Sequence, residues 1–291
     1  MILFSHIYNE EYLLPYWLNH HKKIFNHGVI IDNFSTDKSV DIIKSIVPDW
    51  EIHKGLKEFD SEMIDKKIMN FESKFESHSK VVLNTTEFLN IKNESTFNNL
   101  INVKNSAYFI KTALMVDVFP NENFSNLVID KKYGLWPDSV NLLKAKQTVN
   151  FDIIYSPRDR LIHNYPNGAY SPGRHVSKLE STYMNRDVAE IYWYAFSPWN
   201  KEFKKRKLQI QNTISDIDIE RNFSFQHFKT ESEIEEQYKY FLRYAHDVNK
   251  KLKFSKKIYY LYLNFNFLNI KNKLKNSIKK FLNKSSNFFR N

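Results

Sequence analysis

The first 37 residues constrain the fold more than any other part of the chain, because they read as a strand, a helix and a second strand. An apolar segment at residues 1–4 precedes a helical stretch, and a second apolar segment lies at residues 29–31. Polar side chains follow each apolar segment directly. In open parallel sheets, ligands bind beyond the carboxyl ends of the strands. The pattern therefore predicts an α/β fold with a binding site at one edge of its sheet.

Short apolar segments continue to alternate with amphipathic ones. In the first helical stretch, Leu14, Trp17 and Leu18 recur at three- and four-residue spacing, which gives one apolar stripe to pack on a sheet. Such alternation favours a mostly parallel sheet with helices on its faces. A run at 107–119 adds one or two strands. We expect strands near 1–7, 28–33, 50–53 and 79–84, and helices near 10–25, 37–46 and 61–77.

The composition excludes several classes of site. The chain has no cysteine, which rules out disulfides and thiolate metal sites and fits a reducing cytoplasm. With 5 glycines, it lacks both the dinucleotide-binding fingerprint and a P-loop. His20, His21 and His27 have no nearby carboxylate that would complete a zinc site.

Two sequence blocks resemble one known family. The first block consists of the segment NEEYL at 9–13, Trp17, the pair HH at 20–21, Gly28 and the segment DNFSTD at 32–37. The second block is the stretch RLIHNYPNGAYSPGRH at 160–175. Together they resemble the bacterial family 2 type glycosyltransferases, which have the glycosyltransferase A fold. The resemblance implies a Rossmann-like, mostly parallel central sheet flanked by helices. It also implies a hexosyltransferase-like enzyme that uses a nucleotide-sugar donor and inverts the sugar by single displacement.

The resemblance places the nucleoside pocket after the first two strands. Carboxylates and amides suit ribose hydroxyls and base edges, because they accept or donate hydrogen bonds in fixed directions. Ser, Thr and Asp are also common helix caps, so Ser35, Thr36 and Asp37 could instead begin the second helix. The implied pocket residues are His6, Asn9, Glu10, Asp32, Ser35 and Asp37.

The sequence departs from the family at the diphosphate site. The family carries an Asp-x-Asp motif that is followed by Glu-Phe-Leu, and the two aspartate carboxylates hold the divalent metal. In this chain Asn84 and Thr86 occupy the two aspartate positions, and Glu87 follows them. Mg²⁺ and Mn²⁺ prefer charged oxygen ligands. Glu87, also a candidate catalytic residue, and His163 are the remaining metal candidates. Either the nucleotide completes a weak metal site, or cations replace the metal.

The second block supplies those cations on a turn-rich loop. Arg clamps phosphate through paired donors, and His binds either a metal or a phosphate oxygen. The alternative is that aromatic residues pack this loop and its cations are solvated. The candidate phosphate ligands are His163, Arg174 and His175, with Lys178 one turn later.

A general base is harder to identify from the sequence. An inverting transferase needs one carboxylate near the acceptor hydroxyl. Asp138 is our first choice, because it follows an aromatic and proline-bounded stretch that suits a sugar-binding wall. Glu58 and Asp60 are alternatives, and each of the three could equally be an ordinary surface carboxylate.

Beyond 175 the pattern becomes helical and charged, and three parts are expected: a nucleotide-sugar-binding catalytic domain at 1–175, a helical extension at 176–247, and a basic amphipathic tail at 248–291. Of the 43 Lys and Arg residues, 12 lie in this tail, which contains no Asp or Glu, so residues 1–247 hold 31 basic against 33 acidic residues. This distribution argues against nucleic-acid binding.

The tail has apolar residues at helical spacing with lysines between them. Such helices lie in the interface of anionic membranes. The alternatives are a solvated end or a helix that docks on a partner protein. We therefore expect a cytoplasmic enzyme, peripheral on the inner face of the plasma membrane, that acts on a surface-glycan or lipid-linked acceptor. The competing hypothesis is a scaffold or binding module that kept the transferase fold and lost catalysis.

Overall fold

The computed structural model describes residues 1–118, 120, 133–135, 158–221, 223 and 227–248. The chain divides into two compact units, Met1–Asn249 and Lys250–Asn291. Asp138 and the amphipathic tail lie outside the described residues, so the predictions about them stay predictions. No helix in the described part of the chain has both the length and the apolar character needed to span a bilayer.

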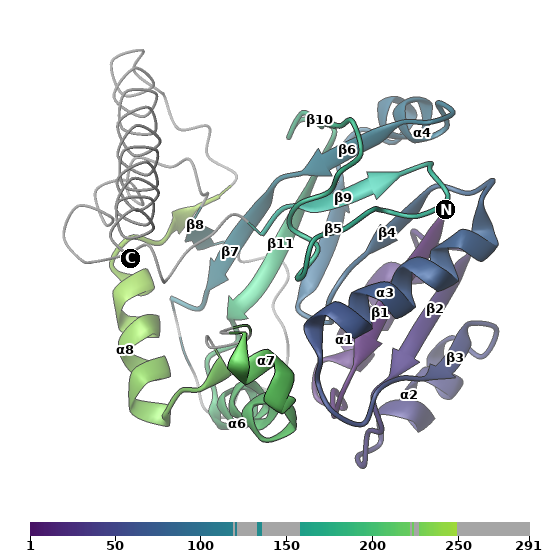
Figure 1. Ribbon diagram of the computed structural model, residues 1–291. Helices are drawn as coiled ribbons and strands as arrows, with labels where there is room; N and C mark the ends of the chain where they lie inside the picture. Colours follow the sequence, from purple (N-terminus) through teal and green to yellow (C-terminus); the bar gives the residue numbers. More distant parts are fainter. Residues whose placement is uncertain (119, 121–132, 136–157, 222, 224–226, 249–291) are drawn as a thin grey trace, which may run out of the picture. The chain divides into compact units, whose positions relative to one another are not determined.

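A seven-stranded sheet forms the first layer, in the order β10-β6-β9-β4-β1-β2-β3 (Figure 1). Strands β4, β1, β2 and β3 run parallel to one another, whereas β9 is antiparallel to both β4 and β6. The predicted class, a mostly parallel α/β sheet flanked by helices, is confirmed. The strands are β1 (Ile2–Ile7), β2 (His27–Asp32), β3 (Glu51–Lys54), β4 (Lys80–Val82), β6 (Ala107–Ile110), β9 (Arg160–His163) and β10 (Thr182–Tyr183).

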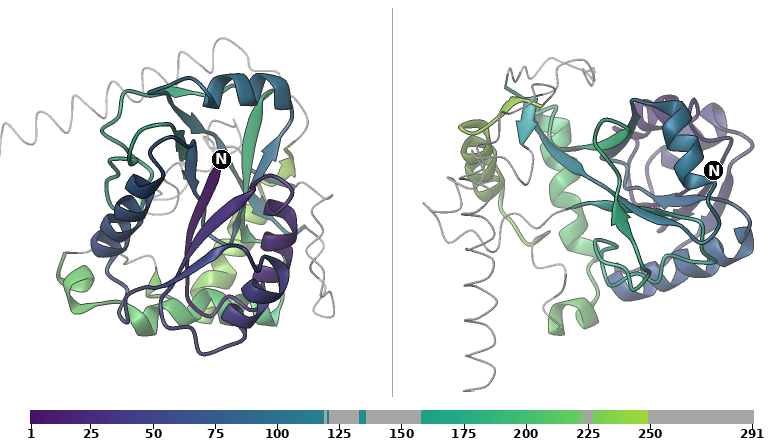
Figure 2. Two further views of the ribbon diagram at one scale, coloured as in Figure 1. Left: turned by 90° about the vertical axis from the view of Figure 1, so that its right-hand side faces the viewer. Right: turned by 90° about the horizontal axis from the view of Figure 1, so that it is seen from above.

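Helices cover both faces of this sheet, because side chains alternate along each strand. Leu3 and Ile30 pack with α1 (Leu14–His21) and α2 (Ser39–Ile46) in one core cluster. Phe4 and Ile31 pack with α3 (Ser61–Glu72) in another. In the left view of Figure 2, α3 lies on one side of β1 and β2, and α1 lies on the other. The sequence thus predicted the first three strand and helix units to within a few residues.

A second sheet, in the order β12-β8-β7-β11-β5, packs in the same core cluster as α1. The indole Nε1 of Trp17 in α1 donates to the carbonyl oxygen of Glu87, the first residue of β5, at 2.9 Å. The strands are β5 (Glu87–Ile91), β7 (Thr112–Val116), β8 (Tyr133–Leu135), β11 (Ala189–Phe196) and β12 (His246–Asp247).

Strand β11 corrects the helical interpretation of residues 176–247. It pairs with β5 on one side and β7 on the other. Seven of its eight residues are buried, so the sequence shows no periodicity that would distinguish a strand from a helix. The aromatic residues of this segment favour a strand. Residues before and after 175 therefore share both sheets, and the division into a catalytic domain and an extension remains a functional hypothesis.

The remaining helices are short and lie mainly after β11. The helical pattern expected beyond 175 is found around Tyr238, in a helix whose N-terminus has a capping box between Thr230 and Glu233. The elements are η1 (Ser73–Phe75), α4 (Glu94–Ile101), α6 (Lys201–Gln209), η3 (Ile210–Thr213), α7 (Asp216–Glu220) and α8 (Glu231–Leu242).

Candidate functional site

A cavity of about 600 Å³ opens beyond the carboxyl ends of β1, β2 and β4. The loops after these strands form one wall, and α6, β11 and α8 form the other. Among its described lining residues, cations outnumber carboxylates, which are Glu10 and Asp65. The lining cations are Arg158, Arg160, Arg174, Arg206, Lys207 and Lys229. Such an excess of positive charge in a cavity suits an anionic ligand.

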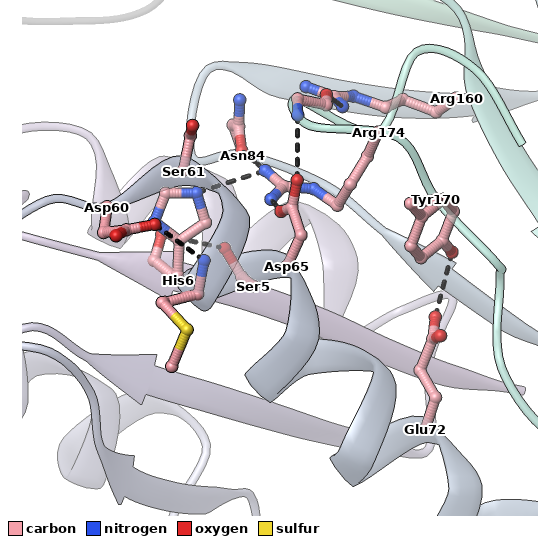
Figure 3. A network of polar contacts seen from close by, with 12 residues as sticks. Ser5, His6, Asp60, Ser61, Asp65, Glu72, Asn84, Arg160, Tyr170 and Arg174 are labelled. Carbon is pink, nitrogen blue, oxygen red and sulfur yellow. Dashed lines mark hydrogen bonds and ion pairs between the residues drawn. The ribbon is translucent and has the colours of Figure 1, made fainter. Parts of the chain in front are cut away.

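Arg174 is the hub of the polar contacts on the strand side of the cavity (Figure 3). Its Nη1 forms an ion pair with Asp65 of α3, and its Nη2 donates to Asn84 Oδ1 at 3.0 Å. The same Nη2 lies 3.1 Å from Nε2 of His6. We call His6, Asp65, Asn84 and Arg174 the open network. The Nε of Arg174 is buried and has no hydrogen-bond partner among the described residues, so the guanidinium retains one donor.

The His6 imidazole is held neutral within this network. Burial, followed by the nearby Arg174 and Arg160 guanidinium groups, lowers the pKa of His6 well below its usual range. Because a guanidinium only donates, His6 Nε2 accepts from Arg174. The site therefore contributes one fewer positive charge than its residue types suggest.

The turn that presents Arg174 needs an unusual backbone. Gly173 has φ +87° and Arg174 has φ +62°, both in the left-handed region. The amide of Gly173 donates to Asp65 Oδ2 at 2.8 Å, so the same carboxylate holds both the turn and the side chain. Asp65 was not among the predicted site residues.

Glu87 lies beneath the cavity rather than in its lining. Its carboxylate accepts from Arg160 Nε at 2.8 Å and Nη2 at 2.7 Å, and from the Asn84 amide at 2.8 Å. Both side chains are buried. Arg160 Nη1 then donates to the Gly173 carbonyl oxygen at 2.8 Å, so the pair positions the Arg174 turn.

The candidate metal ligands do not fit a divalent ion. Glu87 is fully hydrogen-bonded to Arg160 and Asn84, and Asn84 Oδ1 already accepts from Arg174. Within the described residues, no group of three His, Asp or Glu side chains could hold a metal. Thr86 lines the cavity but offers only a neutral oxygen.

His163 lies at the other end of the sheet from the cavity. Because β9 runs antiparallel to β4, it begins with Arg160 at the cavity end of the sheet. Its last residue, His163, pairs with Lys80, the first residue of β4. The sequence interpretation treated 160–175 as one loop and so placed His163 beside Arg174. The structure separates them, and His163 is not among the described residues that line the cavity.

His163 instead belongs to a closed network with Glu72, Gly168 and Tyr170. Its Nε2 lies 3.1 Å from Glu72 Oε1, the Tyr170 hydroxyl donates to the same oxygen at 2.9 Å, and the Gly168 amide donates to Oε2 at 2.8 Å. Burial, followed by the Glu72 carboxylate, raises the pKa of Tyr170, which keeps the hydroxyl protonated as a donor.

Most predicted nucleoside ligands brace the loops instead of lining the cavity. Asn9 Oδ1 accepts from the Thr36 amide at 2.7 Å, and Ser35 Oγ accepts from the Asn9 amide at 2.9 Å. Asp37 accepts from Glu11 and Ser39 amides at 2.9 Å, and Asp32 from the Ser35 amide at 3.1 Å. The loops after β1 and β2 are thus joined. Asn33, which was not predicted, lines the cavity.

Glu10 lines the cavity as predicted, with its carboxylate in a two-point ion pair with Arg206 of α6. Arg206 Nη2 also donates to Thr85 Oγ1 at 3.2 Å. This contact ties α6 to the loops after β1 and β4.

His175 also lines the cavity, and its buried Nδ1 has no partner among the described residues. Burial, then Arg160, Arg158 and Arg174, strongly lower the pKa of His175, so it is neutral.

The other predicted residues lie elsewhere. Asp60 is the N-cap of α3, where its side chain accepts from the Met63 amide at 2.8 Å. Glu58 and Lys178 are exposed and are not among the lining residues.

The cations of α6 were missed, although the sequence contains a signal for them. Phe203 is buried, and Arg206 and Lys207 follow it by three and four residues, which places them on the same helical face. Two cations on the buried stripe of a helix indicate either ion pairs or a ligand. Lys207 Nζ donates to the Ala195 carbonyl oxygen at 3.1 Å and lies 4.4 Å from the centre of the Phe196 ring.

Comparisons with known proteins add little to this geometry. Neither family models nor curated proteins gave a match. Among solved structures, one similar chain is TarS of S. aureus, with 14% sequence identity and a TM-score of 0.36; the match covers 78% of this chain and 40% of TarS. Its 1–349 fragment has 13% sequence identity and a TM-score of 0.34; the match covers 83% of this chain and 70% of the fragment. The same fragment in complex with UDP-GlcNAc gives 14% and 0.31 over 55% and 44%. TM-scores below 0.5 are too low to support a conclusion about activity.

Proposed function

We propose that this chain is a hexosyltransferase-like glycosyltransferase that moves a sugar from a nucleotide-sugar donor to a surface-glycan or lipid-linked acceptor, with inversion. The observation that supports the proposal is the cation-lined cavity at the carboxyl ends of β1, β2 and β4. A departing nucleoside diphosphate concentrates negative charge, which preorganised cationic donors in a cavity stabilise. The two sequence blocks that resemble family 2 type glycosyltransferases supply the choice of donor.

In this proposal, the strand ends hold the nucleoside and the turn at Arg174 receives the diphosphate. His6 and Asn33 present nitrogen and amide groups at the ends of β1 and β2. Arg174 has an unused Nε donor. Because the carboxylates do not fit a metal, we expect the guanidinium of Arg174 to supply the positive charge. Asp138, outside the described residues, remains our candidate for the general base.

Nucleotide binding tests the proposal directly. We would titrate the full-length protein with a panel of nucleoside diphosphates and nucleotide sugars, with and without Mn²⁺, and follow slow donor hydrolysis. The informative variant is Asp65→Asn/Arg174→Gln, because removing both charges leaves no unpaired buried carboxylate. We expect it to weaken binding at least about tenfold. Lys178→Gln, on the same loop but outside the cavity lining, is the matched control. Absence of nucleotide binding in every condition would contradict the proposal.

A second candidate function is a binding module that kept the fold and lost catalysis. It is favoured by the neutral Asn84 and Thr86 and by the engagement of Glu87 with Arg160. The variant Asn84→Asp/Thr86→Asp separates the two candidates. An adapted, metal-independent site should gain no Mn²⁺ affinity, because the new carboxylate at 84 faces the Arg174 guanidinium. A degenerate site should regain metal affinity, which calorimetry would detect.

The membrane association is a separate proposal that concerns residues 248–291. Their 12 cations and absence of carboxylates would attract them to anionic headgroups. We expect the full chain to co-sediment with vesicles containing anionic lipid and not with neutral vesicles. Equal binding to both would contradict the proposal, as would unchanged binding after removal of the tail.

A further inference from the structure

A second group of cations lines the cavity away from Arg174. We call Arg158, Lys207, Lys229 and the neutral His227 beside them the Lys207 group. They come from three separate segments of the chain: the one before β9, α6, and the one before α8. Burial, then Lys229, Arg206 and Arg158, lowers the pKa of Lys207 to about 7, and burial, then Arg158 and Lys207, lowers the pKa of His227 to about 3. After burial, the neighbouring cations are the next cause of the shift at Lys207, because like charges disfavour its charged form.

The two carboxylates among the described lining residues are already paired with other cations. Glu10 pairs with Arg206, and Asp65 pairs with Arg174. Within the described part of the chain, neither Lys207 nor Lys229 forms an ion pair. On the nearby α8, Glu233 accepts from Thr230 and interacts electrostatically with Lys229, and Glu235 pairs with Lys204 at 3.0 Å. An anion entering the cavity would therefore find positive charge at Lys207 and Lys229 that no ion pair among the described residues neutralises.

The Lys207 group is separate from the open network. The Phe59 ring neighbours one member of each, with its centre 6.0 Å from that of His6 and 6.1 Å from that of His227. Phe59 is fixed by its backbone, whose amide donates to the Thr213 carbonyl oxygen at 2.6 Å, and whose carbonyl accepts from the Ser215 amide at 3.0 Å. One cavity thus contains two groups of basic side chains, each with one histidine ring beside Phe59.

An aromatic surface adjoins the second group. The Arg158 guanidinium carbon lies 4.5 Å from the centre of the Trp193 ring, and Trp193 itself lines the cavity. Aromatic faces pack against the apolar faces of sugars and polyols, while the neighbouring cations bind oxyanions. The combination fits a molecule that carries both a hydroxyl-rich part and a phosphate.

We propose that Arg158, Lys207, His227 and Lys229 form a second oxyanion subsite, which binds a phosphate-bearing acceptor while Arg174 holds the donor diphosphate. The identity of the first ligand rests on the proposed function, but the second subsite does not. A phosphate bound here stabilises the charged form of Lys207, so binding at pH 8 takes up protons from the solvent.

The test is a two-ligand titration of the full-length protein. Saturating nucleoside diphosphate first fills the Arg174 site, and inorganic phosphate or glycerol 3-phosphate is then titrated by calorimetry in two buffers of different ionisation enthalpy. We expect a second binding event with proton uptake at pH 8. The variant Lys207→Gln/Lys229→Gln should weaken it at least about tenfold and change the nucleoside diphosphate Kd by less than about threefold. Lys205→Gln, an exposed cation of the same helix, is the matched control.

The arms of the experiment separate the possible sources of the phosphate. Tighter binding of glycerol 3-phosphate than of inorganic phosphate supports an acceptor with a polyol part. If the double variant weakens the nucleoside diphosphate as much as the phosphate, the Lys207 group belongs to the donor site and the proposal is overturned. Absence of a second event in the wild type also overturns it. If no nucleoside diphosphate binds but phosphate binding depends on Lys207, the donor assignment fails and the subsite stands. Lys207→Arg, which keeps the charge, should retain phosphate binding and guards against misfolding of the double variant.

Discussion

Helix α3 carries two buried carboxylates seven residues apart, and they belong to different networks. Asp65 faces the cavity end, where it joins the open network with Arg174, His6 and Asn84 (Figure 3). Glu72 faces the other end, where it joins the closed network with Tyr170 and His163. Both carboxylates are buried and both bind residues of the 160–175 block. Only the first adjoins the cation-lined cavity.

The two networks differ in how completely their hydrogen-bonding groups are satisfied. In the closed network, the Glu72 carboxylate accepts from the Tyr170 hydroxyl and the Gly168 amide and contacts His163 Nε2. The other ring nitrogen of His163, Nδ1, accepts from the Tyr165 amide at 3.3 Å. In the open network, Arg174 retains an unused donor, and the surrounding cavity carries excess cations. A buried polar group that is fully satisfied stabilises the fold, whereas one with unused donors beside a cavity can bind a ligand.

Removing the acceptor of the closed network should have the largest effect. We expect Glu72→Ala to lower the free energy of unfolding by about 3–5 kcal/mol, because it leaves the Tyr170 hydroxyl, the Gly168 amide and His163 without their shared acceptor. Urea denaturation measures the change. Glu76→Ala, an exposed carboxylate nearby, should stay within about 0.5 kcal/mol. A small loss for Glu72→Ala would mean that the closed network does not stabilise the fold.

A charge-conserving change at Arg174 should separate binding from stability. Arg174→Lys keeps the positive charge but cannot donate to Asn84 and Asp65 with the same fork. We expect the nucleoside diphosphate Kd to rise about tenfold to thirtyfold, or about 1.4–2 kcal/mol, by calorimetry. Unchanged affinity would show that Arg174 acts only as a structural partner of Asp65.

The cations of the cavity should also make stability depend on pH. The pKa of Lys207 is lowered to about 7 in the folded protein, so between pH 7 and about 10 the unfolded chain binds the extra proton. Stability attributable to Lys207 therefore rises with pH in this window, by no more than about 1.4 kcal/mol per pH unit. Urea denaturation at pH 7 and pH 9 should show a smaller rise for Lys207→Gln than for the wild type. Equal slopes would contradict the crowding of cations around Lys207.

The smallest effect is expected at the N-terminus of α3. Asp60→Ala should cost about 1 kcal/mol of stability, because it removes the side chain that accepts from the Met63 amide. Donor hydrolysis corrected for the folded fraction should be unchanged. Loss of activity without loss of stability would instead support Asp60 as the general base.

The fold was predictable where short apolar segments alternate with amphipathic ones. The apolar segment at residues 1–4 identified a strand, and the stripe of Trp17 and Leu18 identified a helix that packs one side on the sheet. Strand β11 could not be read in this way, because it is buried almost throughout. The direction of β9 was also hidden, because pairing with β4 and β6 depends on contacts far apart in the sequence.

The same limits apply to the site. His6, Glu10 and Arg174 were found because they follow strands or lie in a turn-rich block. A polar loop residue can contact either a ligand or a neighbouring loop, and the sequence does not distinguish the two. Asn9 was assigned to the ligand, whereas the structure shows that its side chain accepts from the Thr36 amide. Arg206 and Lys207 were missed because the region beyond 175 was interpreted only as helical and charged, without asking which face of each helix carries its cations.

Strand β9 should tolerate no change in length. Its four residues place Arg160 beside Glu87 at one end and His163 beside Glu72 at the other. Ile162 and Leu161 between them belong to the core clusters on opposite faces of the sheet. Insertion or deletion of one residue would invert the facing of everything beyond it, since side chains alternate with a period of two. This one short strand thus sets the spacing between the Glu87–Arg160 pair and the closed network. We expect natural insertions and deletions to occur in the neighbouring turns and not in β9.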